Sequence, residues 1–186
     1  MFPNRQNSWR AVWAIVAISA LAPCTPASTA QSDSTISGAG IGTLRLGMAV
    51  ADVRHRFSVR SDAIELNDEG LPQRVLRIVY LQRELVAKID GAKISSLEIA
   101  QPGFSTPNGI DVGSSLSILL AKEQDWERFP AEGLLYVTSR QSCGISFRLS
   151  YALSEEEHGL NWDWQRLSRL PRETRVEKIV IFGCTR

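Results

Sequence analysis

The sequence contains few of the side chains on which most enzymes depend. Its 186 residues include two histidines, His55 and His158, and three cysteines. It has no G-x-S-x-G elbow, no Walker loop, no H-E-x-x-H helix and no Cys-His nucleophile arrangement. Two histidines nearly exclude a histidine-rich metal site. We therefore expect no catalytic residue, no metal and no cofactor, which favours a non-enzymatic protein.

An excess of charge of one sign is also lacking. The chain has 21 Lys and Arg against 20 Asp and Glu. Proteins that bind nucleic acids or anionic membranes depend on clustered cations. The near balance of charge therefore predicts no nucleic-acid partner.

No apolar run is long enough to cross a bilayer, which takes about 20 residues. The N-terminus has Arg5 and Arg10, an apolar run over 11–22, and a small-residue stretch that ends at Ala30. This order is typical of a secretory signal peptide, and an uncleaved anchor is the alternative. We predict a signal peptide over 1–30, a periplasmic or secreted location, and no stable membrane span after its removal.

Cys24 raises the question of a lipid anchor. The segment Leu21-Ala22-Pro23-Cys24 resembles a bacterial lipoprotein box, but Pro23 stands where a small Gly or Ala is expected. This departure argues against lipidation of Cys24.

The other two cysteines, Cys143 and Cys184, are predicted to form one disulfide, as in other exported chains with an even pair. They flank two apolar strand-like segments. If residue 143 lies opposite 184 in an antiparallel pair, Ile145 faces Phe182 and Phe147 faces Val180, so apolar meets apolar. A redox or metal-binding pair is the alternative, but C-x-x-C spacing is missing.

A ten-residue pattern occurs twice, at 44–53 and 110–119, with Gly47 and Gly113 66 positions apart. Each copy predicts a short strand, a glycine turn and an amphipathic helix. Strand-like runs follow at 75–80, 85–89 and 94–99, and again at 134–138, 143–151 and 176–182. The segment between the first helix and the turn at 67–72 is interpreted as a polar connection.

We therefore predict an α+β fold, in which two tandem helix-plus-antiparallel-strand repeats form one sheet of six to eight strands with helices on one face. Residues 31–40 are expected to be a flexible leader. The single domain covers 41–186, with repeat one at 41–104 and repeat two at 105–186. The other sheet face is expected to be open.

An insertion at 152–175 interrupts repeat two and far exceeds a hairpin loop in length. It contains Trp162, Trp164, Glu156 and His158, which we select as candidate binding residues. The tryptophans either cover one end of the sheet or form an exposed anchor for a protein or sugar. The acidic run could gather a hard cation, but a solvated loop is the simpler interpretation.

Residues 46–57, LGMAVADVRHRF, carry a resemblance to known proteins. The segment resembles the Gly-Met-x-x-x-x-Val strand-to-helix signature of small periplasmic repeat domains, the SmpA/OmlA (BamE-like) lipoproteins and the tandem-repeat beta-lactamase inhibitor proteins. The resemblance implies a helix-plus-antiparallel-sheet unit that binds other proteins without chemistry of its own.

The expected function is therefore that of an exported, non-enzymatic protein that binds another envelope or secreted protein through the open sheet face and the insertion. The alternative is a small-ligand or glycan binder that uses the Trp-containing insertion. A hydrolase that uses the insertion carboxylates ranks last. The sequence specifies neither the partner nor the oligomeric state.

Overall fold

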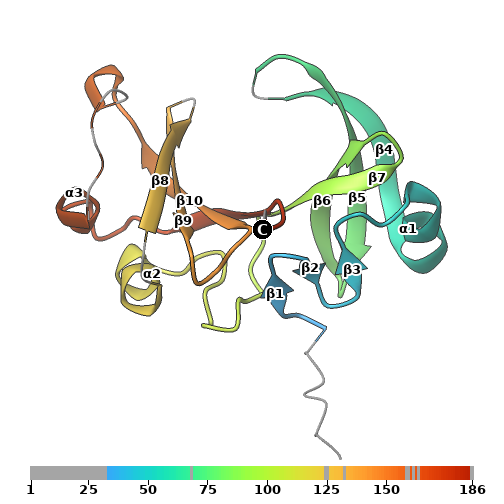
Figure 1. Cartoon of the computed structure of the whole chain (residues 1–186), viewed down its shortest axis with the longest axis horizontal. Coiled ribbons are helices and arrows are strands. Elements are labelled where there is room, and N and C mark those ends of the chain that lie inside the picture. The colour runs from blue at the N-terminus through green and yellow to red at the C-terminus, as the bar shows by residue number, and fades with distance from the viewer. Residues whose placement is uncertain are drawn as a thin grey trace, which may run out of the picture. The chain divides into compact units, whose positions relative to one another are not determined.

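The structure is a computed structural model that describes residues 33–67, 69–123, 126–131, 133–157, 160, 162 and 164–184, with 126–131 and 164 described through their backbone (Figure 1). The predicted signal peptide, Cys24 and His158 lie outside these residues. None of the helices described is long and apolar enough to cross a membrane.

The larger of two sheets has eight antiparallel strands in the order β4-β5-β6-β7-β11-β10-β9-β8. These strands are β4 (Ser58–Leu66), β5 (Pro72–Tyr80), β6 (Arg83–Asp90), β7 (Lys93–Ile99), β8 (Trp126–Ala131), β9 (Leu134–Ser139), β10 (Ile145–Ala152) and β11 (Val176–Ile181). The direct neighbours β7 and β11 join the first four strands to the last four.

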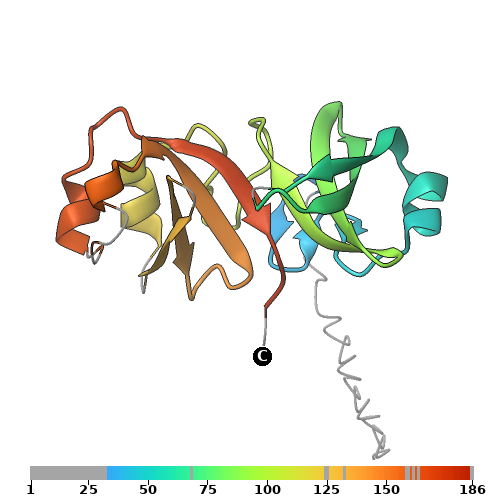
Figure 2. The same cartoon turned by 90° about the horizontal axis from the view of Figure 1, so that it is seen from above.

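The smaller sheet and the helices are short. The small sheet has the order β1-β2-β3, with β1 (Ile36–Ser37), β2 (Gly40–Ile41) and β3 (Leu44–Arg45). The helices are α1 (Val50–Arg56), α2 (Leu116–Lys122), α3 (Trp164–Ser168) and the 3-10 turn η1 (Glu155–Glu157). Helix α1 lies beside the β4 end of the large sheet, and α2 and α3 lie beside the β8 end (Figures 1 and 2).

The predicted α+β fold of two helix-plus-strand repeats with a helical layer is wrong, because the described chain is mostly β and forms two sheets. Helices α1 and α2 have seven residues each, so each is about 10 Å long. Four neighbouring strands extend over about 15 to 20 Å. Helices this short cannot cover the sheet alone, and the small sheet and buried loop residues such as Phe104 and Ile110 complete the cover.

The core lies against one face of the large sheet. Successive side chains of a strand point to opposite faces, and alternate positions of the paired strands are apolar and fully buried. They include Leu76, Ile78, Leu85, Ala87, Leu97, Ile99, Phe147, Ile179 and Ile181. Val53 of α1 and Leu119 of α2 are buried in the same cluster.

The expected flexible leader at 31–40 is also wrong for its described part. Ile36 is fully buried and pairs with Ile41 between β1 and β2, and its N–H donates to the carbonyl of Ser105 at 2.8 Å. Gly38 packs so closely on the backbone of Cys143 that any larger residue would clash there. The small residues of this segment therefore allow close packing instead of providing flexibility.

Two strands of the large sheet were missed in the sequence. Residues 58–66, interpreted as a polar connection, form the nine-residue strand β4, and residues 126–131 form β8. Both are the outermost strands of the large sheet. The described side chains of β4 have no continuous buried face, so the strand lacks the apolar alternation used to find the others.

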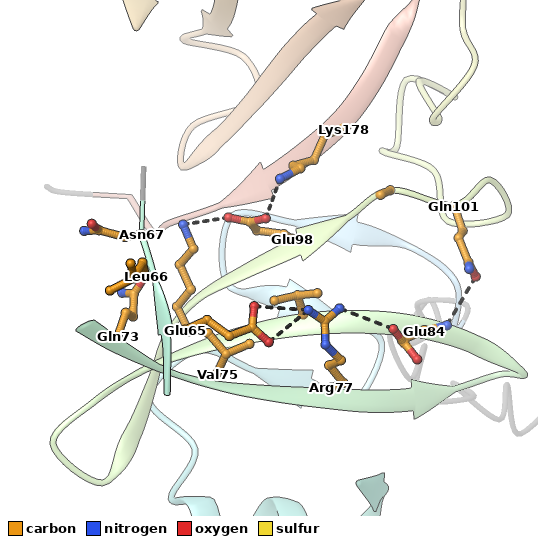
Figure 3. Close-up of a pocket in the computed structure, with 13 residues that line it drawn as sticks. Glu65, Leu66, Asn67, Gln73, Val75, Arg77, Glu84, Glu98, Gln101 and Lys178 are labelled. Atoms are coloured by element: carbon orange, nitrogen blue, oxygen red, sulfur yellow. Dashed lines mark hydrogen bonds and ion pairs between the residues drawn. The ribbon is translucent and has the colours of Figure 1, made fainter. Parts of the chain in front are cut away.

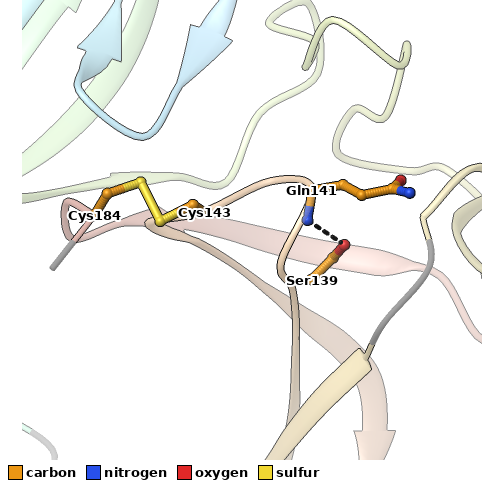
Figure 4. Close-up of a disulfide and its surroundings, with 4 residues drawn as sticks. All are labelled: Ser139, Gln141, Cys143 and Cys184. Carbon is orange, nitrogen blue, oxygen red and sulfur yellow. Dashed lines mark hydrogen bonds between the residues drawn. A yellow bond between two sulfur atoms is a disulfide. The ribbon is translucent and has the colours of Figure 1, made fainter. Parts of the chain in front are cut away.

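The predicted disulfide between Cys143 and Cys184 is confirmed, with 5.4 Å between the Cα atoms (Figure 4). The predicted register is wrong by one residue, because Ile145 pairs with Ile181 and not with Phe182. Gly144 and Gly183 have φ values of 76° and 92°, so the chain leaves the regular pleat between the ladder and the disulfide. Phe182 is consequently half exposed.

Candidate functional site

The candidate site is a hollow on the face of the large sheet opposite the core. It has a cavity volume of about 370 Å³. The strands that form it are β4, β5, β6, β7 and β11 (Figure 3). Its lining residues are Glu65, Leu66, Asn67, Gln73, Val75, Arg77, Glu84, Val86, Lys88, Glu98, Ala100, Gln101 and Lys178.

The six ionised side chains of this hollow are Glu65, Arg77, Glu84, Lys88, Glu98 and Lys178, and we call this set the charged face. Their positions follow from strand alternation. Arg77 lies between Leu76 and Ile78, which are both fully buried on the core side. The same pleat that directs apolar side chains into the core therefore directs these charges into the hollow.

Glu98 links three neighbouring strands. Its two carboxylate oxygens lie 2.7 Å from Nζ of Lys88 on β6 and 2.6 Å from Nζ of Lys178 on β11 (Figure 3). The Glu98 side chain is 13% exposed. Burial by itself raises the pKa of this carboxyl, but the hydrogen bonds and charges of the two lysines outweigh it and hold the pKa below its usual value. Glu98 is therefore ionised at neutral pH.

Arg77 is the centre of a second group of ion pairs. It donates from Nη2 to Glu65 at 2.9 Å, and its Nη1 lies 3.5 Å from Glu84. Glu84 also accepts from Nη1 of Arg60 at 2.8 Å. The hydrogen bond to Glu65 raises the pKa of Arg77 further. Acidic and basic groups thus alternate across the hollow, and the charged face carries three of each sign.

The ionised side chains of the charged face are paired with one another. Each ionised group of the charged face has a partner of opposite sign, so none is presented as an isolated nucleophile or base. Within the residues that the structure describes, no group of three or more His, Cys, Asp or Glu gathers as a metal site would require. Complementary charges across an interface determine which partner binds and in which orientation more than they increase the binding affinity.

The sequence-selected Trp162 does not lie in this hollow. Its side chain is 3% exposed, its Nε1 donates to the carbonyl of Glu157 at 3.3 Å, and its ring meets Tyr151 edge-on at 6.0 Å. The guanidinium of Arg166 lies 5.8 Å from the ring centroid. These contacts favour the interpretation of Trp162 as cover for the sheet.

Among the other sequence-selected residues, the structure describes one side chain, that of Glu156. Glu156 is exposed in η1. The side chain of Trp164 and the whole of His158 lie outside the described residues, so their predicted binding role stays a prediction. Sequence analysis missed the charged face, although the alternation of Arg77 with Leu76 and Ile78 was a signal that could have indicated it.

A second hollow, of about 510 Å³, lies between α2 and α3. It is lined mainly by the apolar residues Leu116, Leu120, Leu170 and Pro171. Two of these, Leu116 and Leu120, belong to the core cluster. Residues 161 and 163, next to α3, lie outside the described residues.

Comparison with known proteins finds a solved structure with a similar fold. No family model matches the chain, and no curated protein matches its sequence. Among solved structures, the uncharacterized protein yfeY from Escherichia coli is similar, with a TM-score of 0.55 and 16% identity over 80% of this chain and 99% of that chain. A likeness at this identity shows the fold alone. The resemblance to the SmpA/OmlA and beta-lactamase inhibitor proteins therefore stays a prediction.

Proposed function

We propose that this protein is an exported, non-enzymatic binding module that holds another envelope or secreted polypeptide on the charged face. The observation that carries the proposal is the hollowed sheet face, on which acidic and basic side chains alternate over five strands. Export to the periplasm or beyond is supported by the Cys143–Cys184 disulfide and by the signal-like N-terminal sequence.

A polypeptide fits the hollow better than a small molecule does. Small-molecule sites are mostly apolar, with a few polar groups that orient the ligand. Here nine of the thirteen lining residues are polar or charged. A protein surface offers both signs of charge over a comparable area, and such complementary patterns select one partner and disfavour others.

The alternative of a small-ligand or glycan site on the insertion is less well supported at Trp162, one of its two tryptophans. Aromatic recognition of a sugar needs an accessible ring face, whereas Trp162 is buried against Tyr151 and Arg166. The proposal therefore moves the binding surface from the insertion to the charged face.

The test uses a swap of one ion pair. In the double variant Arg77→Glu/Glu65→Arg, the pair between positions 65 and 77 can reform, and Glu84, which loses Arg77, keeps its ion pair with Arg60, so the fold is expected to persist. The charge pattern shown to a partner is reversed at two positions. The wild-type chain, the swap and the control Glu173→Lys, which changes an exposed residue outside the hollow, serve as baits in an envelope extract. The captured polypeptide is identified by mass spectrometry, and its binding is then measured with the purified partner by calorimetry.

We expect the wild type and Glu173→Lys to bind the same polypeptide with similar affinity. The swap should bind it at least tenfold more weakly, which corresponds to a loss of about 1.4 kcal/mol of binding free energy. Equal affinity of the swap would contradict a role for the charged face. A wild-type bait that captures no polypeptide would contradict the proposed function itself.

A further inference from the structure

The outer edge of β4 and the hairpin that follows it expose apolar side chains. Ile64, Leu66 and Leu71 are 67%, 73% and 56% exposed, the three highest values among the large hydrophobic side chains that the structure describes. Strand β4 is the last in the order of the large sheet, so its outer edge has no neighbouring strand in the described part of the chain. A long edge strand with apolar side chains is a template for pairing with another chain.

The usual protection of an edge strand is weak here. Edges are blunted by lysine, by proline or by charges directed at an incoming strand. Strand β4 contains no lysine and no proline. Its charges are engaged within the protein, since Asp62 accepts from Arg54 and Arg74 at 2.6 Å each and Arg60 donates to Glu84. Glu65 is engaged in the same way with Arg77.

The charges along this segment indicate which kind of chain fits the edge. The basic residues Arg54, Arg56 and Arg60 lie before or near the start of β4, and Arg54 and Arg60 stay 52% and 69% exposed despite their ion pairs within the protein. The acidic Glu65 lies next to the last residue of the strand, and Glu69 follows in the turn. An antiparallel copy of the same segment places the basic end of each strand beside the acidic end of the other. Opposite charges in such positions stabilise paired strands, and like charges destabilise them.

We propose that a second copy of this chain pairs antiparallel with the outer edge of β4 about a twofold axis at Ile64, which joins two eight-stranded sheets into one. In this register Ile64 of one copy lies opposite Ile64 of the second copy. Leu66 of each copy is the diagonal neighbour of Ile64 of the other copy on the same face. Arg60 comes beside the turn that contains Glu69 of the second copy. The same patch serves both copies, as in most symmetric dimers.

This register also keeps the faces of the two sheets in agreement. Opposite residues of paired strands point to the same face, so Ala63 of one copy lies opposite Glu65 of the other on the side of the charged face. Ile64 lies on the other side. Leu66, which also borders the hollow at the end of β4, lies opposite Asp62 of the second copy. Glu65 and Leu66 also line the hollow, so the proposed edge borders the charged face, but the pairing requires no partner there.

The experiment measures the mass of the protein in solution and the rate of cross-linking between copies. The full chain is expressed with its N-terminal segment, and the exported protein is purified. Sedimentation velocity over a concentration series is expected to show a species of about twice the monomer mass. Ile64→Arg places two like charges across the axis and is expected to abolish that species. The control Ile118→Arg changes another half-exposed apolar side chain, on α2, and is expected to leave it intact.

A cysteine at the axis tests the register without disturbing the pairing. Ile64→Cys is expected to form a disulfide between copies on mild oxidation much faster than Ile118→Cys. A wild-type chain that remains monomeric at all concentrations would overturn the proposal. A dimer that persists in Ile64→Arg, or equal cross-linking of the two cysteine variants, would overturn it as well.

Discussion

Replacing Glu98 by glutamine tests how the two parts of the large sheet are joined. Strands β7 and β11 are paired through three residue pairs, and Glu98 lies opposite Val180 in the middle one. Its carboxylate reaches Lys178 across this junction and Lys88 on the other side. Glutamine keeps the shape of the side chain but removes the charge, and it leaves the two partly buried ammonium groups, 25% and 21% exposed, without their shared counter-ion.

The expected loss lies between two known limits. An exposed ion pair contributes about 0.2 to 1 kcal/mol, and removal of one partner from a fully buried pair costs about 3 to 5 kcal/mol. Glu98 is 13% exposed and takes part in two pairs, so we expect its replacement to lower the free energy of unfolding by about 2 kcal/mol at pH 7. The control Glu177→Gln removes one pair whose carboxylate is 48% exposed, and it should cost less than about 1 kcal/mol.

The effect should depend on pH. Because the folded pKa of Glu98 is lowered, its stabilisation is complete above the pKa of an unfolded glutamate, about 4.3, and is lost as the pH falls through the folded value. Urea unfolding of the wild type and Glu98→Gln with the disulfide intact should therefore show a difference at pH 7 that shrinks in acid. No difference at pH 7, or the same difference in strong acid, would refute the reasoning.

Three further predictions concern stability. Replacing Cys143 and Cys184 by alanine opens a link between residues 41 positions apart and should cost about 4 kcal/mol by the chain-entropy estimate, measured by urea unfolding against the wild type. Trp162→Ala removes a buried ring and should cost about 3 kcal/mol or more without weakening capture of a partner by the folded protein; lost binding with unchanged stability would contradict its role as cover. Asp62→Asn should lower the denaturation midpoint at pH 7, because Arg74 and Arg54 hold the pKa of this carboxyl well below its usual range. The difference in midpoint between the wild type and the variant should narrow only in strong acid. A difference that has already vanished near pH 4 would contradict this reasoning.

Individual strands and helices with a regular apolar pattern were predictable from the sequence. The run at 85–89 lies in β6, and Leu116, Leu119 and Leu120 form the buried side of α2. The turn at Asp90-Gly91 follows from glycine, which adopts a φ of 57° there. The fold class was wrong because helix and strand patterns do not specify how many residues each element has, and the helices that the structure describes have seven at most.

The candidate site was less accessible to sequence reasoning. The insertion was selected as a binding segment because it contains two tryptophans. Trp162 is buried through contacts with Tyr151 and Arg166, and these contacts could not be predicted from the sequence. The charged face depends on strand order. Glu98 and Lys178 are 80 positions apart and meet because β7 is the neighbour of β11.

The sequence by itself determined the cysteine pair, the short amphipathic helices and most of the inner strands, because periodicity and cysteine count are local or compositional properties. The tertiary structure alone decided the register beside the disulfide, the edge strands and the charged face. An edge strand is recognised by the neighbour it lacks, and an ion pair between distant strands exists only after the sheet has brought them together. Such properties belong to the arrangement of the elements and not to any one of them.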